Sequence, residues 1–344
     1  MTATGDQLGS LGIGAARARR SRFLERSFRG TTLALGLGLI LLLAFMLIEL
    51  TTGAWRAFSA FGLHFFVGTD WNPVAGRQSF GALPFMFGTM MTSFVAVALA
   101  VPIGVGLALF LNQVRGAFAN PLAVFIDILA AIPSIVYGLW GVFVLLPWLD
   151  RIEPFLTNTI GRIPVVGRLF DGKAQGPDML TAGVILAIMI LPIITAVTRE
   201  VIAVVPRDLR EAALALGSTR WESVKMAVLP YARSGIVGAT MLGLGRALGE
   251  TIAVTMVIGN TPQIRASLLA PAATIPSKIA SSFREASSIG LTRSALLGLA
   301  VTLVVWTFLL ALASRALVRK TEQLVGDRLL GEAEPETGSM GVVP

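Results

Sequence analysis

Long uncharged runs constrain this chain more than any other feature. No charged residue occurs between Gly30 and Ile48, or between Gln78 and Val114. A helix that crosses a bilayer needs about 20 mostly apolar residues, and its backbone polar groups must be satisfied within the segment. Charged residues make up 14% of the chain, against about 25% in a typical soluble domain. The sequence therefore predicts an all-α integral membrane protein. It excludes an ordinary soluble enzyme, a nucleic-acid module and a disordered scaffold.

Six segments are expected to cross the membrane. The first is too long for the apolar core of a signal peptide, and no small-x-small cleavage site follows it, so it is interpreted as an anchor. The third is interrupted by Asp127, and the fifth by Arg246 and Glu250. The predicted spans cover residues 31–50, 86–111, 122–147, 179–199, 232–259 and 294–314.

The basic residues predict the orientation. Six arginines lie between Arg17 and Arg29, and this end of the chain has few acidic residues. Because basic flanks stay on the cytoplasmic side, both termini are expected in the cytoplasm. Residues 1–29 then form a cytoplasmic basic segment, residues 30–320 the membrane domain, and residues 321–344 a flexible cytoplasmic tail. The net charge of +8 is interpreted as a topology signal whose partner is anionic membrane lipid, and no nucleic-acid partner is expected.

The amino-acid composition argues against several kinds of functional site. The chain has no cysteine, and His64 is its single histidine, so neither thiolate chemistry nor a histidine-built metal site or hydrolytic triad is expected. The nucleotide-binding pattern G-x-x-x-x-G-K-[ST] does not occur. We therefore expect no catalytic site, no metal site and no cofactor in this chain.

The segment 206–230, between the fourth and fifth spans, predicts two short helices joined by a sharp turn. Gly217 suits the left-handed cap that ends a helix. Thr219 and Glu222 have the spacing of a capping box that begins a second helix, which is expected to end at Leu229–Pro230, where the chain re-enters the membrane. The first helix has an alanine-rich face that buries too little area to anchor in lipid. Docking against a protein groove is therefore favoured, with an interfacial linker as the alternative.

The spacing of Glu211-Ala212-Ala213, Gly217 and Leu229-Pro230 resembles the EAA loop of ABC-importer permeases. In that family the loop forms coupling helices that sit in a cleft of the cytoplasmic ATPase. The resemblance implies the type I ABC importer permease fold, with Glu211, Ala212, Ala213 and Gly217 as ATPase-coupling residues. A rigid capped helix is suited to transmit a push from such a partner.

Arg246 is the most unusual residue in the predicted spans. A charge near the middle of a membrane helix costs roughly 2.5–3.5 kcal/mol on insertion scales. Glu250 is expected one turn later on the same face, beside a seam of small residues spaced four apart. The two charges could neutralise one another and lock two helices, or the guanidinium could grip an oxyanion in a transport pathway. Both roles stay open, and Thr251 is a further candidate for the pathway.

The third span contains a second candidate for the pathway lining. Pro133 frees a backbone carbonyl and kinks the helix. Ser134 and Tyr137 then lie on one stripe with Gly141, and the first two add hydroxyl groups. Ser134 and Tyr137 are therefore predicted to line the pathway.

The motif of residues 131–141, AIPSIVYGLWG, and that of residues 245–251, GRALGET, resemble the phosphate-specific (Pst) ABC importers, in particular their C-type permease subunit. The resemblance covers about residues 60–320. It implies a bacterial inner-membrane protein that forms a heterodimer with a sister permease. It also implies two ATP-binding subunits, which hold the ATP and Mg, and an extracytoplasmic phosphate-binding protein. Arg246 and Glu250 are then expected to be critical for transport.

The residues alone leave three alternative functions open. The same machinery could import another oxyanion such as sulfate or molybdate, because one arginine does not separate these anions. An ATP-independent secondary transporter with Glu250 as a proton carrier would have no use for the loop 206–230. A membrane scaffold in phosphate signalling could coexist with transport.

Overall fold

The structure of the chain is a computed structural model, which describes residues 5–113, 119–164, 166–171, 176–286 and 290–331. It divides into two units, Met1–Gly53 and Ala54–Pro344. The first unit holds most of helix α1 (Gly5–Phe61). The side chains of α1 from Leu24 to Glu49 are all exposed, which suits a helix that is surrounded by lipid or by another membrane protein.

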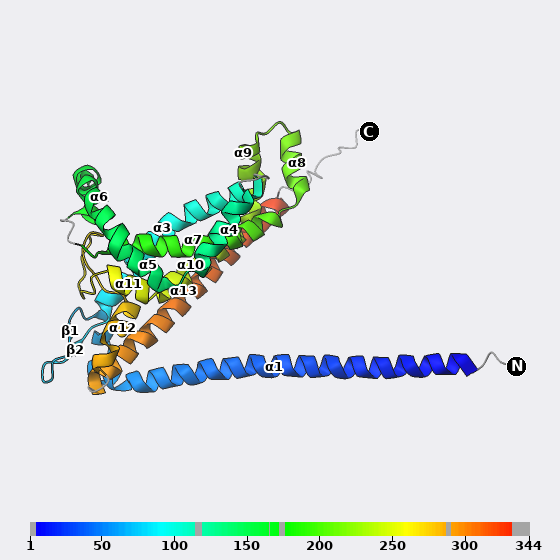
Figure 1. The fold of residues 1–344 in the computed structure, drawn as a ribbon, viewed down its shortest axis with the longest axis horizontal. Helices are drawn as coiled ribbons and strands as arrows, with labels where there is room; N and C mark the ends of the chain where they lie inside the picture. Colours follow the sequence, from blue (N-terminus) through cyan, green and yellow to red (C-terminus); the bar gives the residue numbers. More distant parts are fainter. Residues whose placement is uncertain (1–4, 114–118, 165, 172–175, 287–289, 332–344) are drawn as a thin grey trace, which may run out of the picture. The chain divides into compact units, whose positions relative to one another are not determined.

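The second unit is almost entirely helical, with one short hairpin in which Trp71 pairs with Phe80 and Asn72 pairs with Ser79 (Figure 1). Its first elements are α2 (His64–Val67), β1 (Trp71–Asn72), β2 (Ser79–Phe80), α3 (Leu83–Gln113), α4 (Ala119–Ala131), α5 (Ser134–Trp140), the π-helix η1 (Gly141–Leu145), α6 (Leu146–Thr159), and the 3₁₀ turns η2 (Ile160–Arg162) and η3 (Val166–Phe170). The chain continues with α7 (Met179–Ala203), α8 (Arg207–Ala215), α9 (Arg220–Ser223), the π-helix η4 (Val224–Val228), α10 (Leu229–Gly249), α11 (Ile252–Val257), α12 (Ile275–Ala286) and α13 (Gly290–Gly331).

Five described helical segments are long and apolar enough to cross a membrane. By length and composition, the described residues therefore contain one span fewer than the six predicted. They are Leu24–Phe61, Leu83–Gln113, Ser134–Thr159, Met179–Ala203 and Gly290–Ala316. The predicted fifth span, 232–259, is divided between α10 and α11. Arginines and glycines make it less apolar than the other five.

Two predicted segments can be compared with the helices of the structure. The third span, expected over residues 122–147 with a kink at Pro133, is interrupted between Ala131 and Ser134, because Pro133 has no N–H to continue the helical ladder. The tail expected over residues 321–344 is helical up to Gly331, since its three leucines, Glu322 and Arg328 are good helix formers. Residues 332–344 lie outside the described part of the chain.

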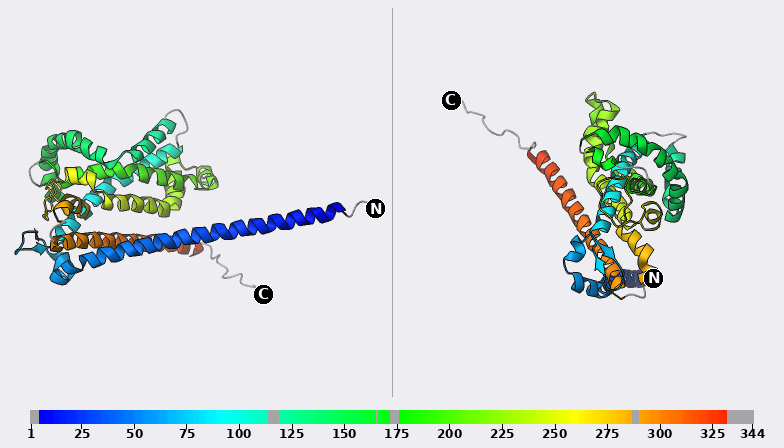
Figure 2. Two further views of the ribbon diagram at one scale, coloured as in Figure 1. Left: turned by 60° about the horizontal axis from the view of Figure 1, so that its bottom comes forward. Right: turned by 90° about the vertical axis from the view of Figure 1, so that its left-hand side faces the viewer.

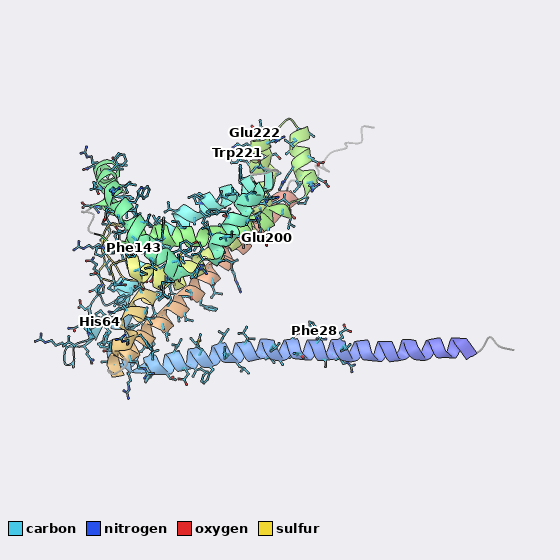
Figure 3. All side chains as sticks on the ribbon, in the orientation of Figure 1. Phe28, His64, Phe143, Glu200, Trp221 and Glu222 are labelled. Carbon is cyan, nitrogen blue, oxygen red and sulfur yellow. The ribbon has the colours of Figure 1, made fainter. Side chains whose placement is uncertain are left out.

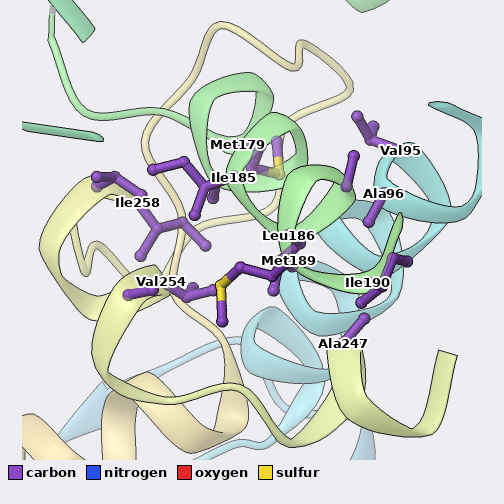
Figure 4. Packing of buried hydrophobic residues seen from close by; sticks show 14 of the residues in the cluster. Val95, Ala96, Met179, Ile185, Leu186, Met189, Ile190, Ala247, Val254 and Ile258 are labelled. Atoms are coloured by element: carbon purple, nitrogen blue, oxygen red, sulfur yellow. The ribbon is translucent and has the colours of Figure 1, made fainter. Parts of the chain in front are cut away.

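Helix α7 is the centre of the second unit. A helix that is apolar all round is typically buried, and Ile185, Ile190 and Ile194 of α7 have no exposed surface. Helices α3 and α10 pack along it, as the two views of Figure 2 show. In the core, Met189 of α7 lies between Val254 of α11 and the side chains of α3 and α10 (Figure 4).

The polar connections gather at the two ends of this bundle. Helices α8 and α9 lie at one end, and the β1–β2 hairpin and α12 lie at the other (Figure 1). Figure 3 shows Trp221 and Glu222 at the first end and His64 at the second. The loop between α7 and α10 is therefore separated from the hairpin by the length of the bundle.

Candidate functional site

A seam of small residues holds α10 against α7, as the sequence predicts. Ala239, Gly243 and Ala247 are buried, and a Cβ at Gly243 would approach the Ile194 side chain to 2.9 Å. Arg246 is exposed on α10, so it does not lie in this buried seam.

The helix that carries Arg246 ends before Glu250, which corrects the expected placement of the two charges. Glu250 has an extended backbone (φ −68°, ψ 128°) and caps α10, so it is not one turn further along the same helix. The Thr251 hydroxyl donates to the Gly249 carbonyl at 3.1 Å. Within the described residues, no ion pair joins Arg246 to Glu250. Breaks of this kind occur inside membrane proteins where the backbone lines a cavity or is covered by protein.

The break around Pro133 is compensated by Tyr137. In a continuous helix the Leu129 carbonyl would accept from residue 133, and proline has no N–H to donate. The Tyr137 hydroxyl donates to this carbonyl instead, at 2.7 Å, and the side chain is buried. Ser134 begins α5 and is half-buried. The predicted kink is therefore present, and the hydroxyl of Tyr137 joins α4 to α5.

Helix α11, which begins directly after the break at Glu250–Thr251, packs on α5, the helix that carries Tyr137. The positive charge of Arg246 lies close enough to the Tyr137 phenol to interact with it electrostatically. Arg246, Tyr137 and the broken backbone at Glu250–Thr251 thus form the candidate substrate site. Their roles in transport stay predictions.

We predict that Tyr137→Phe destabilises the protein by about 0.5–1.5 kcal/mol, the usual net contribution of a hydrogen bond, because the half-buried Leu129 carbonyl then keeps only the longer bond from the Ile132 N–H, at 3.4 Å. Thermal or denaturant unfolding of the purified chain measures this change. Tyr231→Phe is the matched control, because Tyr231 is the other tyrosine of the chain and is 53% exposed. Equal stability of the two variants would contradict the bridging role of Tyr137.

The segment 207–223, which we call the elbow, has the predicted caps. Gly217 adopts a left-handed backbone, with φ +87°, and its N–H donates to the Leu214 carbonyl at 3.0 Å. The Ser218 hydroxyl donates to the Ala213 carbonyl at 2.7 Å. Helix α9 begins with the complete capping box of Thr219 and Glu222.

The elbow presents apolar side chains to its surroundings. No residue of α8 is buried, and Leu216 and Trp221 are 90% and 57% exposed. Of the predicted coupling residues, Glu211, Ala212 and Gly217 are exposed and Ala213 is half-buried. Such a capped, uncovered surface is suited to bind a protein partner.

The second helix of the elbow does not end at Leu229–Pro230, which corrects the predicted boundary. It continues through η4 directly into α10. The Leu229 N–H donates to the Val224 carbonyl, so the helix widens to a π-turn just before Pro230. The ring of Pro230 lacks an N–H, and this local widening accommodates it without a break.

The capping box predicts a pH dependence at the elbow. Hydrogen bonds from the Thr219 backbone N–H and hydroxyl lower the pKa of the Glu222 carboxyl. A carboxyl whose pKa is lowered by folding stabilises the folded state above its ordinary value of 4.5, and this contribution is lost as the pH falls through the lowered pKa. The protection of the Thr219 amide, measured against its intrinsic exchange rate at each pH, is expected to fall over that acidic range. Glu222→Gln should remove the pH dependence, and an unchanged profile in that variant would contradict the assignment.

One structural residue was missed by the sequence reasoning. Asp178 is buried and accepts from the Thr181 N–H at 2.7 Å, which caps the start of α7. Its position directly before an apolar run is the signal that could have found it.

Comparisons with known proteins show the family of the chain. Residues 100–323 match the family described as binding-protein-dependent transport system inner membrane component. The phosphate transport system permease protein PstC of Pasteurella multocida (strain Pm70) is 45% identical, over 88% of this chain and 94% of the relative. The PstC protein of Mesorhizobium japonicum is 42% identical, over 90% and 95% of the two chains.

The fold has a counterpart among solved structures. A chain of a bacterial ABC transporter that imports the acidic polysaccharide alginate superposes with a TM-score of 0.52. The match covers 87% of this chain and 99% of that chain, at 16% sequence identity. At this identity the likeness concerns the fold alone.

Proposed function

The chain belongs to the family of binding-protein-dependent transport system inner membrane components, and we propose that it is the permease subunit of an ATP-driven phosphate importer. Its relatives named as phosphate transport permeases match nearly the whole chain. As a member of this family it is a protein of the bacterial inner membrane. The substrate is inorganic phosphate, carried into the cell by alternating access.

The observation that carries this function is the capped, exposed elbow. It connects α7 with α10, the helix that carries Arg246, so movement of the elbow acts directly on the candidate substrate site. Exposed apolar residues at its surface give a partner ATPase a place to dock, through Glu211, Ala212, Ala213 and Gly217. The elbow and both termini then lie in the cytoplasm, and the hairpin end faces outward.

The complete importer contains other subunits in this proposal. A sister permease forms a heterodimer with this chain, and two ATP-binding subunits dock on the cytoplasmic side. An extracytoplasmic phosphate-binding protein delivers the substrate to the outer face. ATP and Mg bind to the ATPase subunits, and this chain contributes no catalytic site.

The substrate site works through Arg246. A guanidinium presents planar donors that match the oxygens of an oxyanion. The attraction between the two charges is strongest where little water competes. Phosphate enters from the outside and pairs with Arg246, while Glu250, Ser134, Tyr137 and Thr251 belong to the surrounding pathway. ATPase closure then pushes the elbow, and the helices rock about Arg246 to open the site inward.

Uptake of labelled phosphate into vesicles that contain the complete importer tests this function. Uptake should require ATP and persist when a protonophore dissipates the proton gradient. Uptake that needs the gradient and not ATP would indicate a secondary transporter instead. Sulfate or molybdate uptake in place of phosphate would indicate another oxyanion importer.

A further inference from the structure

A cavity of about 230 Å³ lies between the elbow and the ends of α3 and α7. We call it the elbow pocket. It is smaller than the roughly 300–1,000 Å³ typical of pockets for drug-sized ligands. Its polar wall consists of Asn112 and Gln113 of α3, Arg210 of α8, and Arg220 and Ser223 at α9, and the rest of its lining is apolar.

The charge of the elbow pocket is positive. Arg210 and Arg220 line it, and no acidic residue is among its lining residues. Two acids directly neighbour lining residues along the chain. Glu211 is exposed, and Glu222 is already bonded to Thr219 at 2.7–2.8 Å. An anion that enters the pocket therefore meets two guanidinium groups without a competing carboxylate in its wall.

The polar wall is held in place by the end of α7. The Asn112 amide donates to the Arg199 carbonyl at 3.0 Å, and Arg210 Nη2 donates to the Ile202 carbonyl at 3.0 Å. These bonds occupy carbonyls at the negative end of the helix dipole, which would otherwise repel an anion. They also fix the Arg210 guanidinium against the membrane bundle.

Arg210 retains unused donor capacity. Its Nε–H is buried and has no acceptor within the described residues. Burying a donor without a partner costs free energy, and an anion bound beside this guanidinium reduces that cost electrostatically. The orphaned donor is thus a second observation, independent of the cavity, that points to a missing anion.

We propose that the elbow pocket binds a phosphate group, and that the bound group fastens the elbow to the end of α3. Two arginine forks match the oxygens of a phosphate. The group could be the headgroup of an anionic phospholipid, because basic pockets at the cytoplasmic ends of membrane helices bind such headgroups, or free inorganic phosphate. The cytoplasmic location of the elbow pocket, and with it an effect on ATPase coupling, rests on the proposed function. Binding of the phosphate group to the pocket does not depend on that function.

Hydrogen exchange of the full chain in nanodiscs tests the proposal and separates the two sources. One arm compares phosphatidylcholine discs with discs that also contain phosphatidylglycerol. The other adds inorganic phosphate to the phosphatidylcholine discs. Slower exchange of amides in residues 207–223 in the first arm alone identifies the lipid headgroup, and in the second arm alone it identifies the free anion.

Variants make the test specific. Arg220→Gln leaves the capping box intact. It should raise the ligand concentration needed for half-maximal protection about tenfold, as expected for loss of a charged hydrogen bond. Arg207→Gln is the matched control, because Arg207 is an exposed elbow arginine outside the pocket lining. It should leave the protection unchanged. If Arg220→Gln fails to fold, Arg220→Lys, which keeps the charge and loses the fork, should show an intermediate loss.

Protection in neither arm, or equal loss in Arg207→Gln and Arg220→Gln, would overturn the proposal. These readouts need no ATPase and no transport. An importer that fails to carry phosphate but shows the protection would therefore refute the proposed function and leave the pocket assignment in place.

Discussion

Phosphate uptake is expected to fall at least tenfold when Arg246 is replaced by glutamine, while the importer still assembles. The guanidinium is exposed on α10 and outside the buried seam, so its removal leaves the packing of α10 on α7 unchanged. A hydrogen bond to a charged group contributes about 1.5–3 kcal/mol, which corresponds to a loss of about 10-fold or more in binding. Labelled-phosphate uptake and co-purification of the subunits measure the two halves of this prediction.

Arg246→Lys is the matched variant for this test. Lysine keeps the positive charge but loses the planar fork, so it should retain a measurable part of the uptake. Full uptake by Arg246→Gln would contradict the substrate-binding role of Arg246. Loss of the assembled complex in Arg246→Gln would show that its role is structural.

Replacement of Gly217 by valine is expected to uncouple the importer from its ATPase. Gly217 has φ +87° with nothing within 4 Å of an added Cβ, so the substitution is disfavoured by backbone conformation and not by collision. A left-handed backbone costs an L-residue roughly 1–2 kcal/mol, and more for a β-branched side chain. The turn between α8 and α9 should therefore open, and the ATPase should no longer co-purify.

The control for Gly217→Val is Gly76→Val. Gly76 also has a positive φ, +81°, and open space around it, but it lies in the β1–β2 connection at the other end of the bundle. This variant carries comparable strain and should keep the ATPase bound. Loss of the ATPase in both variants would mean that general destabilisation, and not the elbow, is responsible.

Features with local causes could be predicted from the sequence. The cap at Gly217 and the capping box of Thr219 and Glu222 depend on neighbouring residues only, and both are present. The kink at Pro133 follows from a missing N–H. The small-residue seam also follows from spacing along one helix.

Features set by tertiary contacts could not be predicted in this way. The break at Glu250–Thr251 contains no proline. Gly249 directly precedes it, but several other glycines of the same helix mark no break, and the expected alignment of Glu250 with Arg246 is wrong. The bond from Tyr137 to Leu129 depends on how the chain bends after Pro133. The elbow pocket joins residues of α3, α8 and α9 that are far apart in the sequence.

Competition during ATP-driven uptake tests the central claim most directly. The complete importer, reconstituted with its binding protein and supplied with labelled phosphate, should accumulate label only with ATP. Excess unlabelled phosphate should suppress this accumulation, and excess sulfate should leave it unchanged. Accumulation that sulfate suppresses as strongly as phosphate does, or that proceeds without ATP, would contradict a phosphate-specific ATP-driven permease.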